Sequence, residues 1–146
     1  MKLIFKTVLV CLIAGLFASC AKEAKEMQKQ LILLTNPSGW LRVKVEEKST
    51  TGIWVDITDT TSPIDADNLL IFDPWFNWAV DEGELKLEAN PQIIASGTWS
   101  FVDNMKKIQI TDGNLMEIIT LTKTDFVTVI TTNGVTYRYT YVLGGK

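Results

Sequence analysis

The chain has 146 residues, a net charge of −3, two cysteines and no histidine. Without histidine it lacks the commonest general base, the Ser-His-Asp and Cys-His catalytic arrangements, and the usual zinc sites. Its acidic balance disfavours nucleic-acid binding, because a negative protein gains no attraction to phosphate groups. We therefore expect a protein that is not an enzyme, with no cofactor, no metal and no nucleic-acid partner.

The first twenty residues follow the order of segments found in secretory leaders. Lys2 and Lys6 give a positive start, an apolar stretch follows, and the small residues Ala18 and Ser19 precede Cys20. The apolar run 8–17 is shorter than the about 20 residues that a membrane-spanning helix needs. Residues 16–20, Leu-Phe-Ala-Ser-Cys, resemble the lipobox of bacterial lipoproteins, although phenylalanine stands where that family usually has leucine.

This resemblance implies that residues 1–19 are a removed signal peptide and that Cys20 is the lipidated first residue of the mature chain. An ordinary signal peptide with an incidental cysteine is the alternative. The expected partner is then the membrane, reached through an N-terminal acyl anchor, and the expected location is the bacterial outer membrane, on its periplasmic or its cell-surface face. Cys11 would leave with the leader, so no cysteine would remain for a disulfide or a reactive thiol.

The start of the mature chain has helical composition. Residues 21–35 contain Ala, Lys, Glu, Gln, Met and Leu without Gly or Pro, and Asn-Pro-Ser-Gly at 36–39 would end a helix. The first part is charged and residues 31–34 are strongly apolar. We interpret residues 20–36 as a tether and an N-terminal helix that docks on the domain formed by residues 37–146.

From residue 40 onward, short runs rich in Val, Ile, Thr and aromatic residues alternate with turn residues. Asn133-Gly134 and Asp112-Gly113 are typical of hairpin turns. Such a meander must close on itself to avoid open edges, which predicts a mainly β, antiparallel up-and-down barrel. The predicted strands are 40–47, 53–58, 68–72, 77–81, 94–102, 106–111, 115–122, 125–131 and 135–142.

Several short motifs occur in one order along this region: Leu-Leu-Thr at 33–35, Asp-Asn at 67–68, Val-Asp-Glu-Gly at 80–83, Gly-Thr-Trp-Ser at 97–100 and Tyr-Arg-Tyr at 137–139. The ordered set resembles the lipocalin-like lipoprotein domains common in Bacteroidetes. The resemblance implies a barrel of about eight strands with a helix closing one end. It implies no chemistry, because the functions of these domains are mostly unknown.

Two sets of aromatic residues are candidates for contact with a ligand or a partner. Trp40 and Trp99 are most simply residues of the core and barrel floor, with ligand contact as the alternative. The turn at 73–77 should place Trp75 and Phe76 at its tip, with Trp78 close by. These aromatic residues form either an exposed lip at the barrel mouth, contacting a ligand, a partner or the membrane, or a plug over the opening.

The last predicted strand carries Tyr137, Tyr139 and Tyr141 on one face and Arg138 on the other. Facing inward, the tyrosines would line a pocket with polar tips, and facing outward they would stabilise the sheet surface. Both alternatives stay open at the level of the sequence.

The acidic residues suggest no catalytic or metal site. Asp56, Asp59, Asp65 and Asp67 lack the spacing of a calcium-binding loop, and a solvated acidic loop is favoured. The carboxylates at 81, 82 and 84 have no nucleophile motif beside them. The sequence therefore predicts a lipid-anchored envelope protein whose barrel binds a small apolar ligand or an envelope protein. The alternative is a structural or inhibitory lipoprotein with a filled barrel and no ligand cavity.

Overall fold

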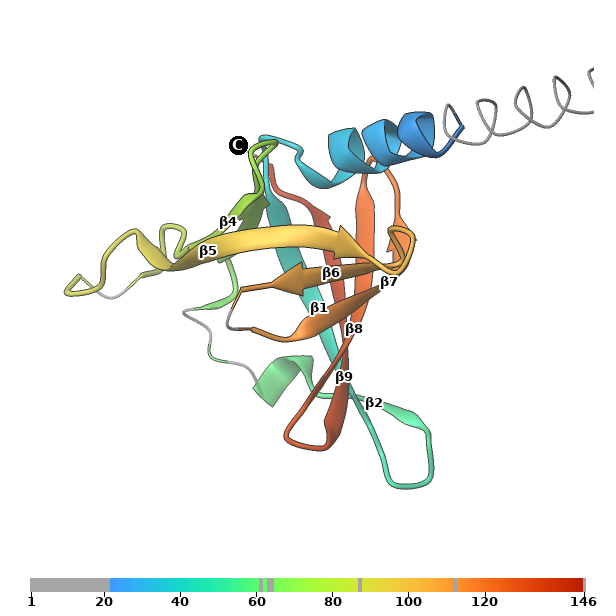
Figure 1. Cartoon of the computed structure of the whole chain (residues 1–146). Coiled ribbons are helices and arrows are strands. Elements are labelled where there is room, and N and C mark those ends of the chain that lie inside the picture. Colours follow the sequence, from blue (N-terminus) through green and yellow to red (C-terminus); the bar gives the residue numbers. More distant parts are fainter. Residues whose placement is uncertain (1–21, 61, 63–64, 87, 112, 146) are drawn as a thin grey trace, which may run out of the picture.

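The computed structural model describes residues 22–60, 62, 65–86, 88–111 and 113–145. The predicted signal peptide and Cys20 lie outside these residues. Within them the chain forms one α-helix at residues 22–34, which we call the N-terminal helix, a short 3-10 helix, and nine strands (Figure 1). The described part of the helix, residues 22–34, lies within the predicted range 21–35.

All nine predicted strands are present, and their ends differ from the predicted ends by at most two residues. In chain order the elements are β1 (Trp40–Lys48), β2 (Trp54–Asp56), η1 (Thr58–Thr60), β3 (Leu69–Phe72), β4 (Asn77–Asp81), β5 (Ile93–Val102), β6 (Lys107–Ile110), β7 (Leu115–Leu121), β8 (Asp125–Thr132) and β9 (Val135–Leu143).

Eight of these strands form a closed antiparallel barrel. Neighbouring strands pair in chain order from β3 to β9, and β1 closes the ring by pairing with β9 on one edge and with β3 on the other. β2 is an additional strand that pairs with the far end of β1, where Lys48 stands opposite Trp54. The predicted fold, a mainly β up-and-down barrel with an N-terminal helix, is confirmed.

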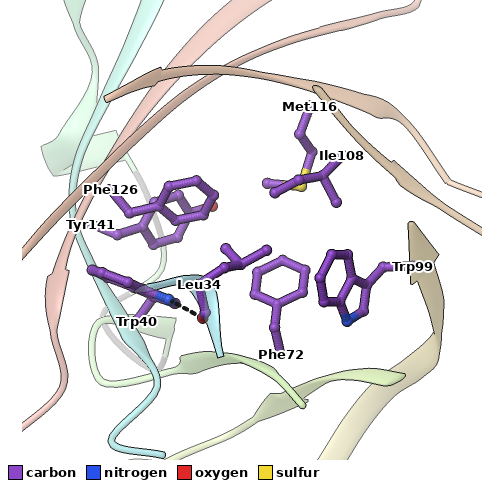
Figure 2. Close-up of a cluster of buried hydrophobic side chains, with 8 residues drawn as sticks. All are labelled: Leu34, Trp40, Phe72, Trp99, Ile108, Met116, Phe126 and Tyr141. Carbon is purple, nitrogen blue, oxygen red and sulfur yellow. Dashed lines mark hydrogen bonds between the residues drawn. The ribbon is translucent and has the colours of Figure 1, made fainter. Parts of the chain in front are cut away.

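The N-terminal helix is fastened to the barrel at its last turn. Leu34 is fully buried in the core, and the indole Nε1 of Trp40 donates a hydrogen bond of 2.8 Å to the Leu34 carbonyl (Figure 2). The last carbonyls of a helix have no partner within the helix, so this bond satisfies one of them. The buried core cluster consists of Leu34, Trp40, Phe72, Trp99, Ile108, Met116, Phe126 and Tyr141.

The two ends of the barrel differ. The N-terminal helix lies across one end, which we call the helix end, together with the β3–β4, β5–β6 and β7–β8 turns. The β1–β2, β4–β5, β6–β7 and β8–β9 connections lie at the opposite end, which we call the distal end (Figure 1). Phe72 and Leu34 belong to one cluster, which places the start of the β3–β4 turn beside the helix.

A group of charged side chains packs on the outer surface where β1, β2 and β9 meet. The Glu46 carboxylate accepts a hydrogen bond of 2.6 Å from Arg138 Nε and one of 3.0 Å from Lys44 Nζ. The Arg138 guanidinium also lies over the Trp54 ring, 4.6 Å from its centroid. Glu46 is nearly buried, so its two cationic partners supply the compensation that a buried carboxylate requires.

Asp67 holds the β4–β5 loop at the distal end. Its Oδ2 atom accepts hydrogen bonds from the backbone N–H groups of Glu84 and Leu85. Gly83 passes so close that a Cβ atom there would lie 2.4 Å from the Asp67 carboxylate, and its φ of +66° also favours glycine. Asp67, from the Asp-Asn motif, and Gly83, from the Val-Asp-Glu-Gly motif, therefore pack against each other and fix this loop.

We expect Gly83→Ala to lower the free energy of unfolding by more than Gly134→Ala does. Both glycines have positive φ, but nothing lies within 4 Å of a Cβ atom at Gly134, so that variant carries only the backbone cost of about 1–2 kcal/mol. Urea denaturation of the two variants measures the difference. Equal losses would show that Asp67 moves aside without cost.

We also expect the Glu46 group to make stability depend on pH. Hydrogen bonding from Arg138 holds the pKa of Glu46 below its ordinary value, so its contribution is present at neutral pH and is lost as the pH falls below about 4.5. Glu46→Gln should lower the free energy of unfolding by about 1–2 kcal/mol at pH 7 and converge with the unmodified protein in acid. The control is Glu88→Gln, a change at an exposed carboxylate; thermal unfolding at several pH values should give parallel curves for it.

Candidate binding site in the barrel

The three tyrosines of β9 face the barrel interior. Tyr141 lies in the core, where its ring stacks on Phe126, and the rings of Tyr139 and Tyr137 follow it at centroid spacings of 6.3 and 6.2 Å. Their opposite partners on β8 are Phe126, Thr128 and Ile130. Of the two orientations that the sequence allowed, the structure has the inward one.

Burial sets the protonation state of the two inner tyrosines. It raises the pKa of Tyr141 and of Tyr139 above the ordinary value near 10, and the positive charge of Arg42 offsets only part of that rise. Both hydroxyls are therefore neutral at physiological pH and can donate hydrogen bonds. They give the interior wall polar tips without negative charge.

Arg42 stands directly opposite Tyr141 on β1 and lines a pocket of about 270 Å³. Its guanidinium makes no ion pair or hydrogen bond with any side chain or carbonyl of the described residues. The other residues lining the pocket are Asp65, Asn68, Leu70, Val80 and Tyr141. This wall is therefore part apolar and part polar, with one cation available for a further contact.

Three more buried polar atoms of the barrel lack a hydrogen-bond partner among the described residues. They are Asn68 Oδ1, Thr128 Oγ1 and Trp78 Nε1, and Thr128 is fully buried. A buried polar group without a partner costs about 1–3 kcal/mol. Buried polar groups without partners are rare in an interior that is only structural. They favour an interior in which a bound molecule supplies the missing hydrogen-bond partners.

The wall next to Arg42 is incompletely paired. β1 and β3 are in register only at Trp40–Leu70 and Leu41–Leu69, and β1 has a bulge between Arg42 and Lys44. Further along, the same edge of β1 contacts the residues that lead into η1: Val45 O accepts a hydrogen bond from Ile57 N, and Val45 N donates to Thr58 Oγ1. A second pocket of about 270 Å³ runs along this edge and is also lined by Arg42. Arg42 thus borders both the interior and a side opening.

The aromatic turn between β3 and β4 divides its two residues between different roles. Asp73 accepts hydrogen bonds from the Trp75 and Asn77 backbone N–H groups, and Phe76 N donates to Asp73 O. Phe76 has a φ of 66° and packs on Trp99 at a centroid distance of 5.1 Å. Trp75 is 79% exposed. Phe76 therefore covers the core as a plug would, and Trp75 points into solvent as a lip would.

The structure does not bring the predicted site residues together in one place. Trp75 and Phe76 lie at the helix end, whereas Tyr137 lies in the half of the barrel toward the distal end. Trp78 faces inward beside Gly97, where a Cβ atom would be 2.9 Å from its Nε1. Trp40 and Trp99 both lie in the buried core. The turn is therefore not the mouth of the barrel, because the helix covers that end.

The acidic residues of the β4–β5 loop have structural partners. Glu82 accepts a hydrogen bond of 2.7 Å from Asn90 Nδ2, and Asp81 accepts from Gly83 N and from Gln92 Nε2. Among the described residues no cluster of three or more carboxylates could hold a metal ion. These contacts fasten the loop to the barrel.

Comparison with known proteins adds no relatives: no family model, no curated protein and no solved structure matches the chain. Within the described part of the chain, no helix combines the length and the apolar character needed to cross a membrane.

Sequence reasoning missed Arg42. In a regular strand that starts at Trp40, position 42 faces inward, but so does position 44, and the two charges there suggest an outward face. The bulge between Arg42 and Lys44 turns Lys44 outward and Val45 inward, which a strict alternation does not show. One feature of the sequence hinted at the bulge: Val45 is apolar at a position that strict alternation from Trp40 assigns to the outward face.

We expect the two residues at the tip of the aromatic turn to behave differently when truncated. Phe76→Ala removes the ring that covers Trp99 and should lower the free energy of unfolding by about 1–2 kcal/mol, less than a fully buried phenylalanine because this side chain is 44% exposed. Trp75→Ala should leave the melting temperature almost unchanged. Thermal unfolding measures both, and an equal loss in the two variants would contradict the division of roles.

Proposed function

We propose that this chain is a lipid-anchored binding protein of the bacterial cell envelope, without catalytic activity, whose barrel holds a small, largely apolar ligand with a polar end. The observation that carries the proposal is the pocket at Arg42, an inward-facing cation without a partner among the described residues, beside the inner tyrosines. The resemblance to lipocalin-like lipoproteins and to the lipobox supports the anchor at Cys20 and the outer-membrane location.

The distribution of packing favours a ligand in one half of the barrel. Toward the helix end the interior is filled by an aromatic cluster. The Phe72 ring centroid lies 5.5 Å from that of Trp99 and 6.3 Å from that of Phe126. Beyond Tyr141 the inward-facing residues include Arg42, Thr128 and Tyr139, with polar atoms that lack partners. An apolar chain in this half would lie against Leu70, Val80 and Ile130, and a negative or polar end would meet Arg42.

A structural envelope protein with a filled barrel is the second candidate. The close packing of the aromatic cluster favours it, because small barrels are often filled by their own side chains. The two candidates differ in whether the interior beyond Tyr141 accepts a guest molecule. An envelope protein as the bound partner stays a further candidate through the exposed Trp75.

Two dyes of matched shape distinguish these candidates. 1-Anilinonaphthalene-8-sulfonate carries an anionic group on an apolar frame, and N-phenyl-1-naphthylamine is its neutral counterpart. We expect both to bind with enhanced fluorescence, and Arg42→Met to weaken binding of the sulfonate by about tenfold while leaving the neutral dye unaffected, since a charge-assisted hydrogen bond contributes about 1.5–3 kcal/mol. Lys48→Met, which removes an exposed cation on β1, is the control.

The same variant separates a binding role from a structural one through stability. Arg42→Met removes a charge without an ion-pair partner, so the melting temperature of the ligand-free protein should stay level or rise. If neither dye binds, the filled barrel is the better description. Mass spectrometry of the protein purified from its own host tests the anchor, as a mature chain that begins at Cys20 and carries acyl mass, and native conditions reveal any retained ligand.

A further inference from the structure

The outward face of the N-terminal helix carries a row of positive charges. At about 100° per residue, Lys22, Lys25, Lys29 and Ile32 fall within about 80° of one another. All four side chains are exposed, Ile32 by 64%. Leu34, which is buried in the barrel, lies about 180° from Lys25. Because the helix lies across the end of the barrel (Figure 1) and docks through Leu34, the row points away from the barrel.

The turns at the helix end extend this surface. Trp75, 79% exposed, stands at the tip of the β3–β4 turn, and the exposed Lys106 and Lys123 lie in the β5–β6 and β7–β8 turns. Two acids near these lysines are engaged: Asp103 pairs with Lys107 at 3.0 Å, and Glu26, which flanks the row on the helix, lies 3.8 Å from Lys29 in an exposed pair that headgroup contacts can replace. The distal end instead carries exposed carboxylates, with Glu84 and Glu88 in the β4–β5 loop. The helix end thus presents a row of lysines beside one large exposed aromatic ring, Trp75.

We propose that the helix end docks on a membrane surface with anionic headgroups: Lys22, Lys25 and Lys29 contact the headgroups, and Ile32 and Trp75 enter the interfacial layer. Charge complementarity selects this occupant, because each cation near an anionic surface contributes about 1 kcal/mol and tryptophan prefers the interface. Chain length agrees with it. Cys20 precedes the helix by two residues, which span at most about 7 Å, so a chain anchored there keeps the helix end close to the bilayer.

The proposal goes beyond the proposed function and rests on it only through the position of the anchor. It assigns an orientation: the helix end faces the lipid, and the distal end and the side opening at Arg42 face away from it. A ligand would then enter from the aqueous side. Acylation alone does not orient the barrel, since a single flexible link leaves it free to rotate.

The test uses the full protein extracted from its host membrane in detergent and reconstituted into vesicles that contain brominated phosphatidylcholine, with or without phosphatidylglycerol. Bromine quenches a tryptophan that enters the lipid layer. We expect quenching in vesicles with phosphatidylglycerol, weaker quenching without it or at high salt, and loss of most of the quenching in Trp75→Ala. Trp54→Phe is the matched control, because Trp54 lies under Arg138 near the distal end and should not contribute.

A second pair of variants tests the charges. The triple change of Lys22, Lys25 and Lys29 to Gln should reduce quenching of Trp75, and Lys48→Gln with Lys86→Gln, two cations away from the helix end, should not. Quenching that persists in Trp75→Ala, or that is the same without phosphatidylglycerol, would overturn the proposal. A second result would also overturn the proposal: shielding of Trp75 from a water-soluble quencher that increases with protein concentration in detergent. That result would show that a second copy of the chain covers this surface. Acylation and ligand binding are read separately by mass, so failure of either is distinguishable from failure of docking.

Discussion

The contact between Trp40 and the last turn of the N-terminal helix is the constraint on which the rest of the molecule depends. The Trp40 indole satisfies the Leu34 carbonyl and packs on Phe126 at 5.4 Å, so one side chain joins the helix, β1 and β8. Because Trp40 is also the first residue of β1 and pairs with both β3 and β9, the point where the barrel closes is also the point where the helix seals it. The barrel is therefore covered by the helix at the helix end and only by strand connections at the distal end.

This asymmetry divides the barrel into a closely packed half and a half that holds polar groups without partners. The aromatic cluster below the helix supplies apolar burial, and each ring in it removes about 150–250 Å² from water. The other half contains Arg42, Asn68 and Thr128, polar groups that reduce stability when they have no partner. A purely structural barrel gains nothing from keeping such groups, whereas a binding protein uses them to recognise the polar part of a guest.

The same asymmetry extends to the surface. The helix docks through Leu34 and so must turn its lysine face outward, because residues 22, 25 and 29 lie opposite Leu34 around the helix axis. The turn that places Phe76 on Trp99 leaves its neighbour Trp75 in solvent. Packing of the interior thus determines which charges and which ring the helix end presents to its surroundings.

The sequence by itself determined the helix, the nine strands and the barrel class, because period-two alternation, hairpin turn residues and the Pro-Gly stop after the helix act within a few residues of the chain. Only the tertiary structure decided which face of β9 points inward, since that depends on pairing with β8 and β1 and either choice has the same local pattern. The β1 bulge that brings Arg42 beside Tyr141 was likewise invisible to strict alternation. Trp75 was expected at a barrel mouth, yet it lies at the sealed end, because the closure of β1 on β3 and β9, between residues far apart in the chain, determines which end the helix covers.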